Sequence, residues 1–295
     1  MTENEFLLAD RIAKIKSMNE LYDLEHNAYI SFSGGKDSTV LHHLVDEALP
    51  ENKIPRVYIN TGIEYKDIVI FVERERERER EGRILILEPT QNIKSVLEQY
   101  GYPFKSKEHS LYLSVYQNSG VGKTVERYLN RPNARFRCPE KLRYQFTEDF
   151  KIKVSNKCCY KLKKDVVNQW AEENHKTITI TGMRAGEGGL RASHKGCAVF
   201  DETKLVKFHP LQPLEDDFMD WYIAERKIEL CRLYYPPFNF KRTGCKGCPY
   251  SVDLQEQLFT MACYLPEERK QCEIIWGKIY DEYRRIGYRL ENTLF

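Results

Sequence analysis

The sequence lacks any apolar stretch close to the ~20 residues that a membrane-spanning helix requires, so we expect no membrane segment. It also lacks an excess of either charge, because 46 Lys and Arg residues against 44 Asp and Glu residues give a formal net charge of +2. This balance does not favour general binding to polyanions. The first residues, MTENEFLLAD, lack the pattern of a signal peptide, and we therefore expect a cytoplasmic protein.

Nine cysteines are present in the 295 residues. In a cytoplasmic protein, cysteines are free thiols, metal ligands or catalytic groups rather than a disulfide framework. The chain is 41% hydrophobic and 31% charged, which fits a globular protein with a substantial core. Its length suits one large domain with insertions, or two domains.

Short apolar segments alternate with helical patterns along the chain. Four of them predict strands, at residues 28–32, 56–60, 84–88 and 177–181. Strands that alternate with helices indicate an α/β fold with a doubly wound parallel sheet. Amphipathic spacing predicts a helix over residues 5–24, a helical insertion occupies about 102–170, and a last helix begins near Pro266 and stops at Gly287.

The segment SFSGGKDST lies where the first predicted strand meets a predicted helix. Two glycines allow a tight turn that directs backbone N–H groups at an anion, and the helix N-terminus adds positive potential. The spacing differs from that of the Walker loop. The segment therefore predicts a phosphate site, and the alternative is an ordinary turn with a serine N-cap. The residues of this site are Ser33, Gly34, Gly35, Lys36, Asp37 and Ser38.

These six residues match in full the SGGxDS signature of the PP-loop ATP pyrophosphatase superfamily, the adenine nucleotide α-hydrolases, which the chain resembles here. The resemblance implies that the loop binds ATP, with Mg²⁺, or a related adenylyl nucleotide. It also implies chemistry at the α-phosphate, with Lys36 in a catalytic role. The fold of that superfamily, a doubly wound sheet, agrees with the strand and helix pattern.

Cys158 and Cys159 are neighbours in the sequence, and Cys245 and Cys248 form a C-x-x-C motif. Neighbouring Cα atoms lie 3.8 Å apart, whereas an ordinary disulfide needs about 5.5–6 Å, so the adjacent pair suits ligation better than pairing. Four thiolates suffice for a Cys₄ zinc site or an iron–sulfur cluster. The alternative is four unrelated reduced cysteines.

A CC pair followed by C-x-x-C, beside a PP-loop, resembles the [4Fe-4S] sulfonucleotide reductases of the phosphoadenylyl-sulfate (PAPS) reductase family. INTGIEY resembles that family's D-T-G segment, with Asn60 in place of Asp, and implies that Thr61 and Gly62 bind the nucleotide. FHPLQPLEDDFMDWYI resembles its strand end followed by a helix. The resemblance, which covers residues of about 26–100 and 156–250, implies a cluster on the four cysteines beside a bound PAPS, adenylyl sulfate or ATP.

ITGMRAGEGGLRAS resembles the family's T-G-x-R segment, which implies that Gly182 binds the nucleotide and that Arg184 and a second arginine, Arg191, take part in catalysis. A guanidinium presents a bidentate fork that suits phosphate or sulfate. The alternative for both arginines is a surface ion pair.

The chain departs from the reductases in one respect: it contains no segment like Glu-Cys-Gly-Leu-His, whose cysteine attacks the sulfate sulfur. Cys197 is the better candidate for a reactive thiol, because Lys195 and His194 would lower its pKa. The alternative is a structural Cys197. A reductase would also need a reductant such as a thioredoxin-like protein.

Three functions therefore remain open. The first is sulfur transfer or sulfonucleotide reduction on an adenylyl nucleotide. The second is adenylation of tRNA or DNA for cluster-dependent thiolation, which the complete SGGKDS loop favours, as do the basic and aromatic residues of the insertion at 122–146. That segment is also typical of a solvated helical insertion. The third is a nucleotide or cluster sensor, or a subunit of a modification complex. For each of the three, a homo-oligomer is one of the expected assemblies.

These motifs give a domain prediction. Residues 1–25 form an N-terminal helix, and residues 26–235 form a PP-loop nucleotide-binding domain that contains the insertion. Residues 236–295 form a C-terminal C-x-x-C loop and helix. The alternating Glu and Arg residues at 73–81 are expected to form the solvated end of a helix that begins near Tyr65.

Overall fold

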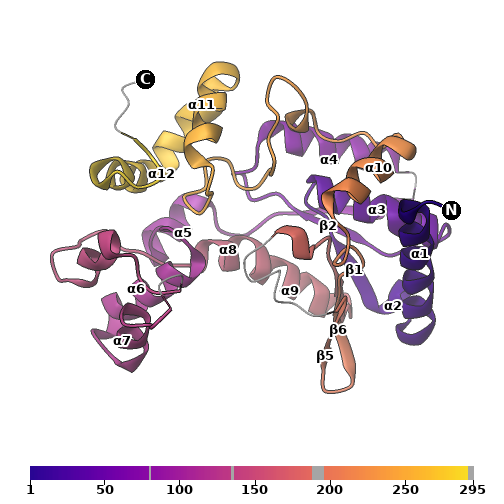
Figure 1. The fold of residues 1–295 in the computed structure, drawn as a ribbon, viewed down its shortest axis with the longest axis horizontal. Coiled ribbons are helices and arrows are strands. Elements are labelled where there is room, and N and C mark those ends of the chain that lie inside the picture. Colours follow the sequence, from indigo (N-terminus) through magenta and orange to yellow (C-terminus); the bar gives the residue numbers. More distant parts are fainter. Residues whose placement is uncertain (80, 134–135, 188–195, 292–295) are drawn as a thin grey trace. The chain divides into compact units, whose positions relative to one another are not determined.

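The structure, a computed structural model, describes residues 1–79, 81–133, 136–187 and 196–291 (Figure 1). The chain divides into two compact units, and each is described by itself. The first unit comprises Met1–Asn60, Lys66–Glu88 and Val166–Thr243. The second comprises Thr61–Tyr65, Pro89–Asp165 and Gly244–Phe295, so it combines most of the predicted insertion with the C-terminal segment.

One sheet of six strands, counted over the described residues, organises the first unit, with the order β3-β2-β1-β4-β6-β5. All neighbours pair in parallel except β5 and β6, which are antiparallel. The predicted α/β class with a mainly parallel sheet is confirmed, and β5 and β6 extend the sheet beyond the four predicted strands. The strands are β1 Ala28–Ser31, β2 Arg56–Ile59, β3 Ile84–Leu87, β4 Ile178–Ile180, β5 Ala198–Asp201 and β6 Lys204–Phe208.

Helices cover both faces of this sheet. Successive residues of a strand point to opposite faces, so Ala28 and Ile30 pack with α1, α3 and α10, whereas Tyr29 packs with Ala171 of α9. The two covered faces explain why β1 and β3, with the sequences AYIS and ILIL, consist almost entirely of apolar residues. The helices of this unit are α1 Glu3–Tyr22, α2 Leu24–Asn27, α3 Lys36–Ala48, α4 Lys66–Arg78, α9 Asp165–Glu173 and α10 Asp216–Glu225, with short turns η3 Ala185–Glu187 and η4 Arg232–Tyr234.

The predicted first helix corresponds to α1, which begins with a capping box between Thr2 and Glu5. The predicted helix near Tyr65 corresponds to α4 and includes the described start of the Glu-Arg repeat. In that repeat, Arg74 and Arg78 form exposed ion pairs with Glu229 at 2.8 and 2.9 Å. Surface pairs of this kind contribute little to stability. Over the described residues, no helix is both long and apolar enough to span a membrane.

The second unit is helical. The predicted last helix is confirmed as α12, which has Pro266 in its first turn and ends at Gly287 with φ of 58°, a left-handed conformation that suits glycine. The helix α11, which precedes it, is an addition to the predicted elements. The elements are α5 Ile93–Tyr100, α6 Lys107–Ser119, α7 Lys123–Leu129, η1 Glu140–Phe146, α8 Lys157–Cys159, the π-helical turn η2 Tyr160–Lys164, α11 Leu254–Tyr264 and α12 Pro266–Ile286.

A buried histidine links three elements of the second unit. The His109 ring is fully buried, and its two nitrogens lie 2.9 Å from the Tyr128 hydroxyl and 2.7 Å from Gln145 Oε1. Burial lowers the pKa of His109 to about 4, so the ring is neutral near pH 7.

This histidine predicts a loss of stability in acid. The unfolded chain takes up the proton below pH ~6.5 and the folded chain only below about 4, so the free energy of unfolding should fall by about 3 kcal/mol as the pH drops through that window. His109→Gln should remove this part of the pH dependence in denaturant titrations. His175→Gln, at an exposed histidine, is the control and should keep it. An unchanged pH dependence in His109→Gln would contradict the assignment.

Candidate functional site

The predicted phosphate loop lies between the end of β1 and the start of α3. Gly34 adopts φ of +67°, and a Cβ atom there would lie 2.8 Å from a methyl group of Val72 on α4. Both the backbone conformation and the close approach of α4 therefore require glycine at this position. Gly35 is the N-cap of α3 and leaves the first N–H groups of the helix at the loop.

The strand order places this loop at the point where the direction of the sheet reverses. The chain continues from β1 to β2 on one side, while β4 flanks β1 on the other side. Ligands of open α/β sheets bind outside the carboxyl ends of the strands at such a point. Gly182 follows β4, and a Cβ atom there would lie 2.8 Å from the Asp37 carbonyl oxygen, so glycine allows β4 to approach the start of α3.

Polar side chains of the loop interact with one another. The Ser33 and Ser38 hydroxyl oxygens lie 3.0 Å apart, and the Ser33 N–H donates to Ser38 Oγ at 3.1 Å. Lys36 Nζ donates to Asp220 Oδ1 at 2.7 Å. Because Asp220 is largely exposed, this ion pair is weak and Lys36 is available to an anionic ligand.

Arg184, a predicted catalytic residue, lies at the same loop. Its guanidinium donates to Asp37 Oδ1 at 3.0 Å and to Asp216 Oδ1 at 2.7 Å. Burial opposes its charge, but the two carboxylates outweigh this effect and raise the pKa of Arg184. The side chain is therefore fixed in its charged form beside the first turn of α3.

Two other predicted residues receive less support from the structure. Arg191 lies outside the described residues, as do His194 and Lys195, the neighbours expected to activate Cys197. Cys197 itself is half-buried at the start of the β5 segment, where its carbonyl oxygen accepts a hydrogen bond from the His209 N–H at 2.6 Å. Its role stays a prediction.

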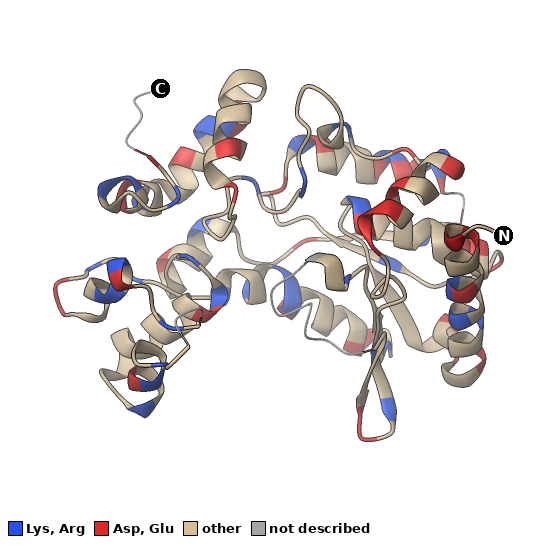
Figure 2. Cartoon of the chain, viewed as in Figure 1, with Lys and Arg blue, Asp and Glu red and all other residues tan. Residues whose placement is uncertain are grey.

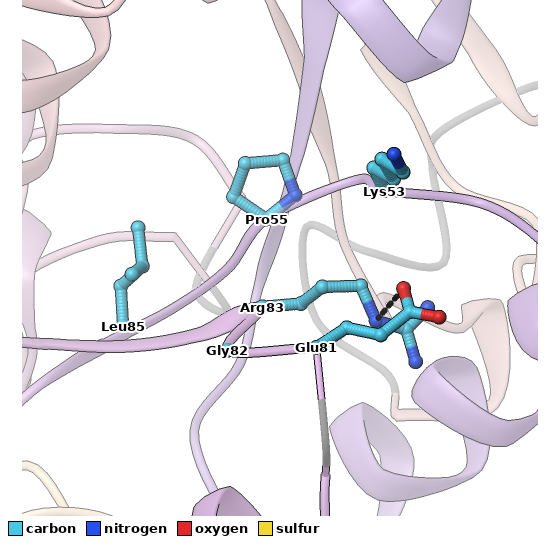
Figure 3. Close-up of a pocket in the computed structure, with 6 residues that line it drawn as sticks. All are labelled: Lys53, Pro55, Glu81, Gly82, Arg83 and Leu85. Carbon is cyan, nitrogen blue, oxygen red and sulfur yellow. Dashed lines mark ion pairs between the residues drawn. The ribbon is translucent and has the colours of Figure 1, made fainter.

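A hollow of about 530 Å³ lies at the other end of the sheet (Figure 3). Pro55 and Arg83 precede β2 and β3, so the hollow lies at the amino ends of these strands, whereas the phosphate loop follows the carboxyl end of β1. Arg83 is already held by Glu79 and Asp46, at 2.7 and 2.9 Å. The lining residues are Lys53, Pro55, Glu81, Gly82, Arg83 and Leu85.

All four predicted metal ligands belong to the second unit. Cys158 and Cys159 lie on α8, directly before the π-helical turn η2, and their sulfur atoms are 4.0 Å apart. Such turns occur frequently at functional sites. Cys245 and Cys248 lie on one tight turn, in which the Cys248 N–H donates to the Cys245 carbonyl at 3.2 Å. The Tyr250 hydroxyl, beyond this turn, donates to the Ser155 carbonyl at 3.5 Å and so connects the two segments.

The four thiols affect one another's protonation. The hydrogen bond from Cys158 lowers the pKa of Cys159 to about 6, with the help of Lys107, Lys163 and Lys164, while the same bond and burial raise the pKa of Cys158. Burial raises the pKa values of Cys245 and Cys248, and charge on the neighbouring thiols acts in the same direction. A cation bound by all four sulfurs would relieve this repulsion and displace the remaining protons.

A lysine that the sequence argument did not single out accompanies these thiols. Lys163 Nζ lies 2.9 Å from the buried carboxylate of Glu64, and the charges of Cys245 and Glu64 overcome the effect of burial and raise the pKa of Lys163. Glu64 also accepts hydrogen bonds from the N–H and hydroxyl of Thr61, at 2.9 and 2.8 Å. The structure thus places the predicted nucleotide ligands Thr61 and Gly62 in the second unit. In the sequence, Lys163 follows Cys159 by four residues, about one helical turn, and this spacing could have indicated that the lysine lies near the thiols.

Three aromatic side chains of α12 hold the C-x-x-C turn. Trp276 Nε1 donates to the Lys246 carbonyl at 3.0 Å, the Tyr280 hydroxyl donates to the Gly247 carbonyl, and the Tyr283 hydroxyl donates to the Pro249 carbonyl at 2.9 Å. All three side chains are buried. The last helix therefore fixes the backbone that carries Cys245 and Cys248, a role that its own amphipathic pattern does not reveal.

A model of a protein family, the phosphoadenosine phosphosulfate reductase domain, matches residues 27–134 and 114–251. The chain belongs to this family. The match confirms the resemblance predicted from the motifs, and it includes the phosphate loop and all four cysteines. The helix α12, which holds the C-x-x-C turn of this PAPS reductase family chain, lies beyond the matched residues. No curated protein gives a significant sequence match to this chain.

Solved structures that resemble this PAPS reductase family chain do so at low identity. They include a PAPS reductase from Candida auris in complex with phosphate, with 12% identity, a TM-score of 0.44, and coverage of 74% of this chain and 81% of that one. An NH₃-dependent NAD synthetase from Campylobacter jejuni has 11% identity, a TM-score of 0.43 and full coverage of both chains. A U34-tRNA thiolase from Methanococcus maripaludis with its [4Fe-4S] cluster has 14% identity, a TM-score of 0.39, and coverage of 99% and 82%. The family assignment rests on the sequence match.

Proposed function

We propose that this protein binds an adenylyl nucleotide at residues 33–38 and carries a [4Fe-4S] cluster on Cys158, Cys159, Cys245 and Cys248. Its reaction is sulfur transfer from, or reduction of, a sulfonucleotide such as PAPS or adenylyl sulfate. The observation that carries the proposal is the presence, in one unit, of four thiols from two distant segments of a PAPS reductase family chain.

The chemistry of the four thiols suits such a cluster. Four sulfurs around one zinc ion would lie about 3.8 Å apart, given Zn–S distances of ~2.3 Å. Over the described residues, no group of three or more Cys, His, Asp or Glu side chains is arranged to hold a single ion. Four thiolates, two from each segment, are the ligand set that an iron–sulfur cluster uses. When bound, the cluster would supply local charge and a rigid connection between them.

Residues of the first unit would bind the nucleotide. The N–H groups at the start of α3, with the Ser33 and Ser38 hydroxyls, would hold a phosphate, and Lys36 would leave Asp220 to contact it. Arg184, fixed by Asp37 and Asp216, would supply a positive charge beside the same loop. Arg191 and Cys197 stay candidates for the second cationic group and for the attacking thiol.

The test uses anaerobically purified full-length protein, supplied first with ATP alone and then with PAPS and a dithiol. In the reductive reaction two thiols are oxidised to a disulfide and the sulfuryl group leaves as sulfite, so sulfite release supports the proposal. Lys36→Ala should weaken binding of ATP and PAPS on the order of 10-fold or more, because a charge-assisted contact with phosphate is lost.

Lys53→Ala, at the amino ends of the strands, is the matched control and should leave nucleotide binding unchanged. Equal nucleotide affinities in the wild type and Lys36→Ala would contradict a phosphate site at the loop. Zinc without sulfide in the purified protein would contradict the cluster.

A second candidate function, adenylation of a nucleic acid for thiolation, is favoured by a hollow of about 410 Å³ in the insertion. Arg131 lies over the rings of Tyr112 and Tyr128, and Phe136 is 45% exposed beside it. Cationic and aromatic groups together suit phosphates and unstacked bases. Arg127 of α7 also lines the hollow, and α7 carries basic and acidic residues together (Figure 2). Pyrophosphate release from ATP that tRNA or DNA stimulates would favour this function over reduction.

A further inference from the structure

A tyrosine from a distant segment contacts the phosphate loop. The Tyr234 hydroxyl accepts a hydrogen bond from the Lys36 N–H at 2.9 Å, although the two residues are 198 positions apart. The Thr243 hydroxyl lies 2.8 Å from the same phenolic oxygen. Both residues, like the loop, belong to the first unit.

These hydroxyls gather around Gly35. A Cβ atom at Gly35 would lie 3.2 Å from the Tyr234 oxygen, 3.5 Å from the Thr243 oxygen and 3.3 Å from Ser33 Oγ. The absence of a side chain at Gly35 therefore leaves room for hydroxyl groups at the N-terminus of α3. The local signature SGGKDS predicts only two of them, Ser33 and Ser38.

The Tyr234–Thr243 pair has one hydroxyl proton that is not used in their mutual hydrogen bond and can be donated to a ligand. Each hydroxyl carries one proton, and their mutual hydrogen bond uses one of the two, whichever residue donates it. The Lys36 N–H occupies a lone pair of Tyr234 and uses no hydroxyl proton. Within the described parts of the chain, neither hydroxyl donates to any other acceptor. A donor at the N-terminus of a helix, beside two serine hydroxyls, suits an oxygen of a phosphate or pyrophosphate group.

We propose that Tyr234 and Thr243 are phosphate-binding residues of the nucleotide site, which the pair completes by donating a hydroxyl hydrogen bond to a phosphate oxygen of the ligand. This inference rests on the proposed nucleotide-binding function and adds a second segment to its site. The Lys36–Tyr234 contact orients the phenol. Because either hydroxyl can donate in the Tyr234–Thr243 hydrogen bond, the other hydroxyl keeps its proton and can donate it to the ligand.

The test is calorimetric titration of the full-length protein with ATP and with inorganic pyrophosphate. Tyr234→Phe should weaken binding of both on the order of 10-fold, as expected for a lost hydrogen bond to a charged group. Thr243→Val should weaken both in the same direction, and Thr243→Ser, which restores the hydroxyl, should bind like the wild type. Tyr235→Phe removes a neighbouring hydroxyl that accepts from the Leu230 N–H, and as the control it should have no effect.

The outcomes separate this inference from the proposed function. If Lys36→Ala no longer binds ATP while Tyr234→Phe and Thr243→Val bind it like the wild type, the hydroxyl pair is not part of the site. The proposed nucleotide binding at residues 33–38 would still be supported. If Tyr234→Phe binds more tightly, the phenol competes with phosphate for the Lys36 N–H, and the inference is wrong. If the wild type binds neither ATP nor pyrophosphate, both the function and the inference fall. Because Thr243→Val keeps the Lys36–Tyr234 contact, it remains informative if Tyr234→Phe fails to fold.

Discussion

Replacing Cys245 and Cys248 together with serine should abolish the iron content of the purified protein, from about four atoms per chain to near zero. A serine hydroxyl is a hard, weakly acidic ligand that does not replace a thiolate on iron or zinc. The two remaining thiols, Cys158 and Cys159, are adjacent on α8 and share a hydrogen bond, so they would supply ligands from one side only. Iron and acid-labile sulfide assays on anaerobic preparations, together with visible absorption, measure the effect.

Cys263→Ser is the matched control, since Cys263 is an exposed cysteine of the same unit. It should retain the full iron content and the wild-type absorption spectrum. Iron retained in the double variant would rule out these four residues as the ligand set. A wild type that carries zinc without sulfide would instead indicate a mononuclear site.

The elements that the sequence predicts well are those with a strong local pattern. The strands β1 to β4, the helix α1 and the ends of α12 at Pro266 and Gly287 each depend on a few neighbouring residues, and the structure has all of them. The phosphate loop likewise depends on six consecutive residues, Ser33 to Ser38. The edge strand β5 is not predicted, because its apolar part is only three residues long, Ala198 to Phe200, and is followed at once by Asp201 and Glu202.

The site residues that the sequence does not predict all act through contacts between distant segments. Tyr234 reaches the Lys36 N–H, and Trp276 reaches the Lys246 carbonyl, but both look like ordinary core aromatics in the sequence. Glu64 is similar, because its partner Lys163 lies on another segment. Hydrogen bonds of this kind depend on the tertiary fold, and no local pattern specifies them.

A second large effect is expected at Gly247, the residue between the two cysteines of the C-x-x-C turn. Its φ of +60° is unfavourable for any residue with a side chain, and a Cβ atom would lie 2.7 Å from Cys272 Sγ and closer still to the Tyr280 hydroxyl. Gly247→Ala should therefore either push α12 away from the turn or distort the turn itself. We expect it to lower the free energy of unfolding by on the order of 3 kcal/mol and to reduce the iron content strongly.

Gly244→Ala is the control, since a Cβ atom at Gly244 meets no heavy atom within 4 Å, and it should change neither quantity. Trp276→Phe separates the two causes, because it removes one hydrogen bond to the turn without adding volume. If α12 positions the ligands, Trp276→Phe should speed iron loss to a chelator while causing a smaller loss of stability than Gly247→Ala. If iron loss is as slow as in the wild type, α12 supports the unit without positioning Cys245 and Cys248, and the effect of Gly247→Ala is purely steric.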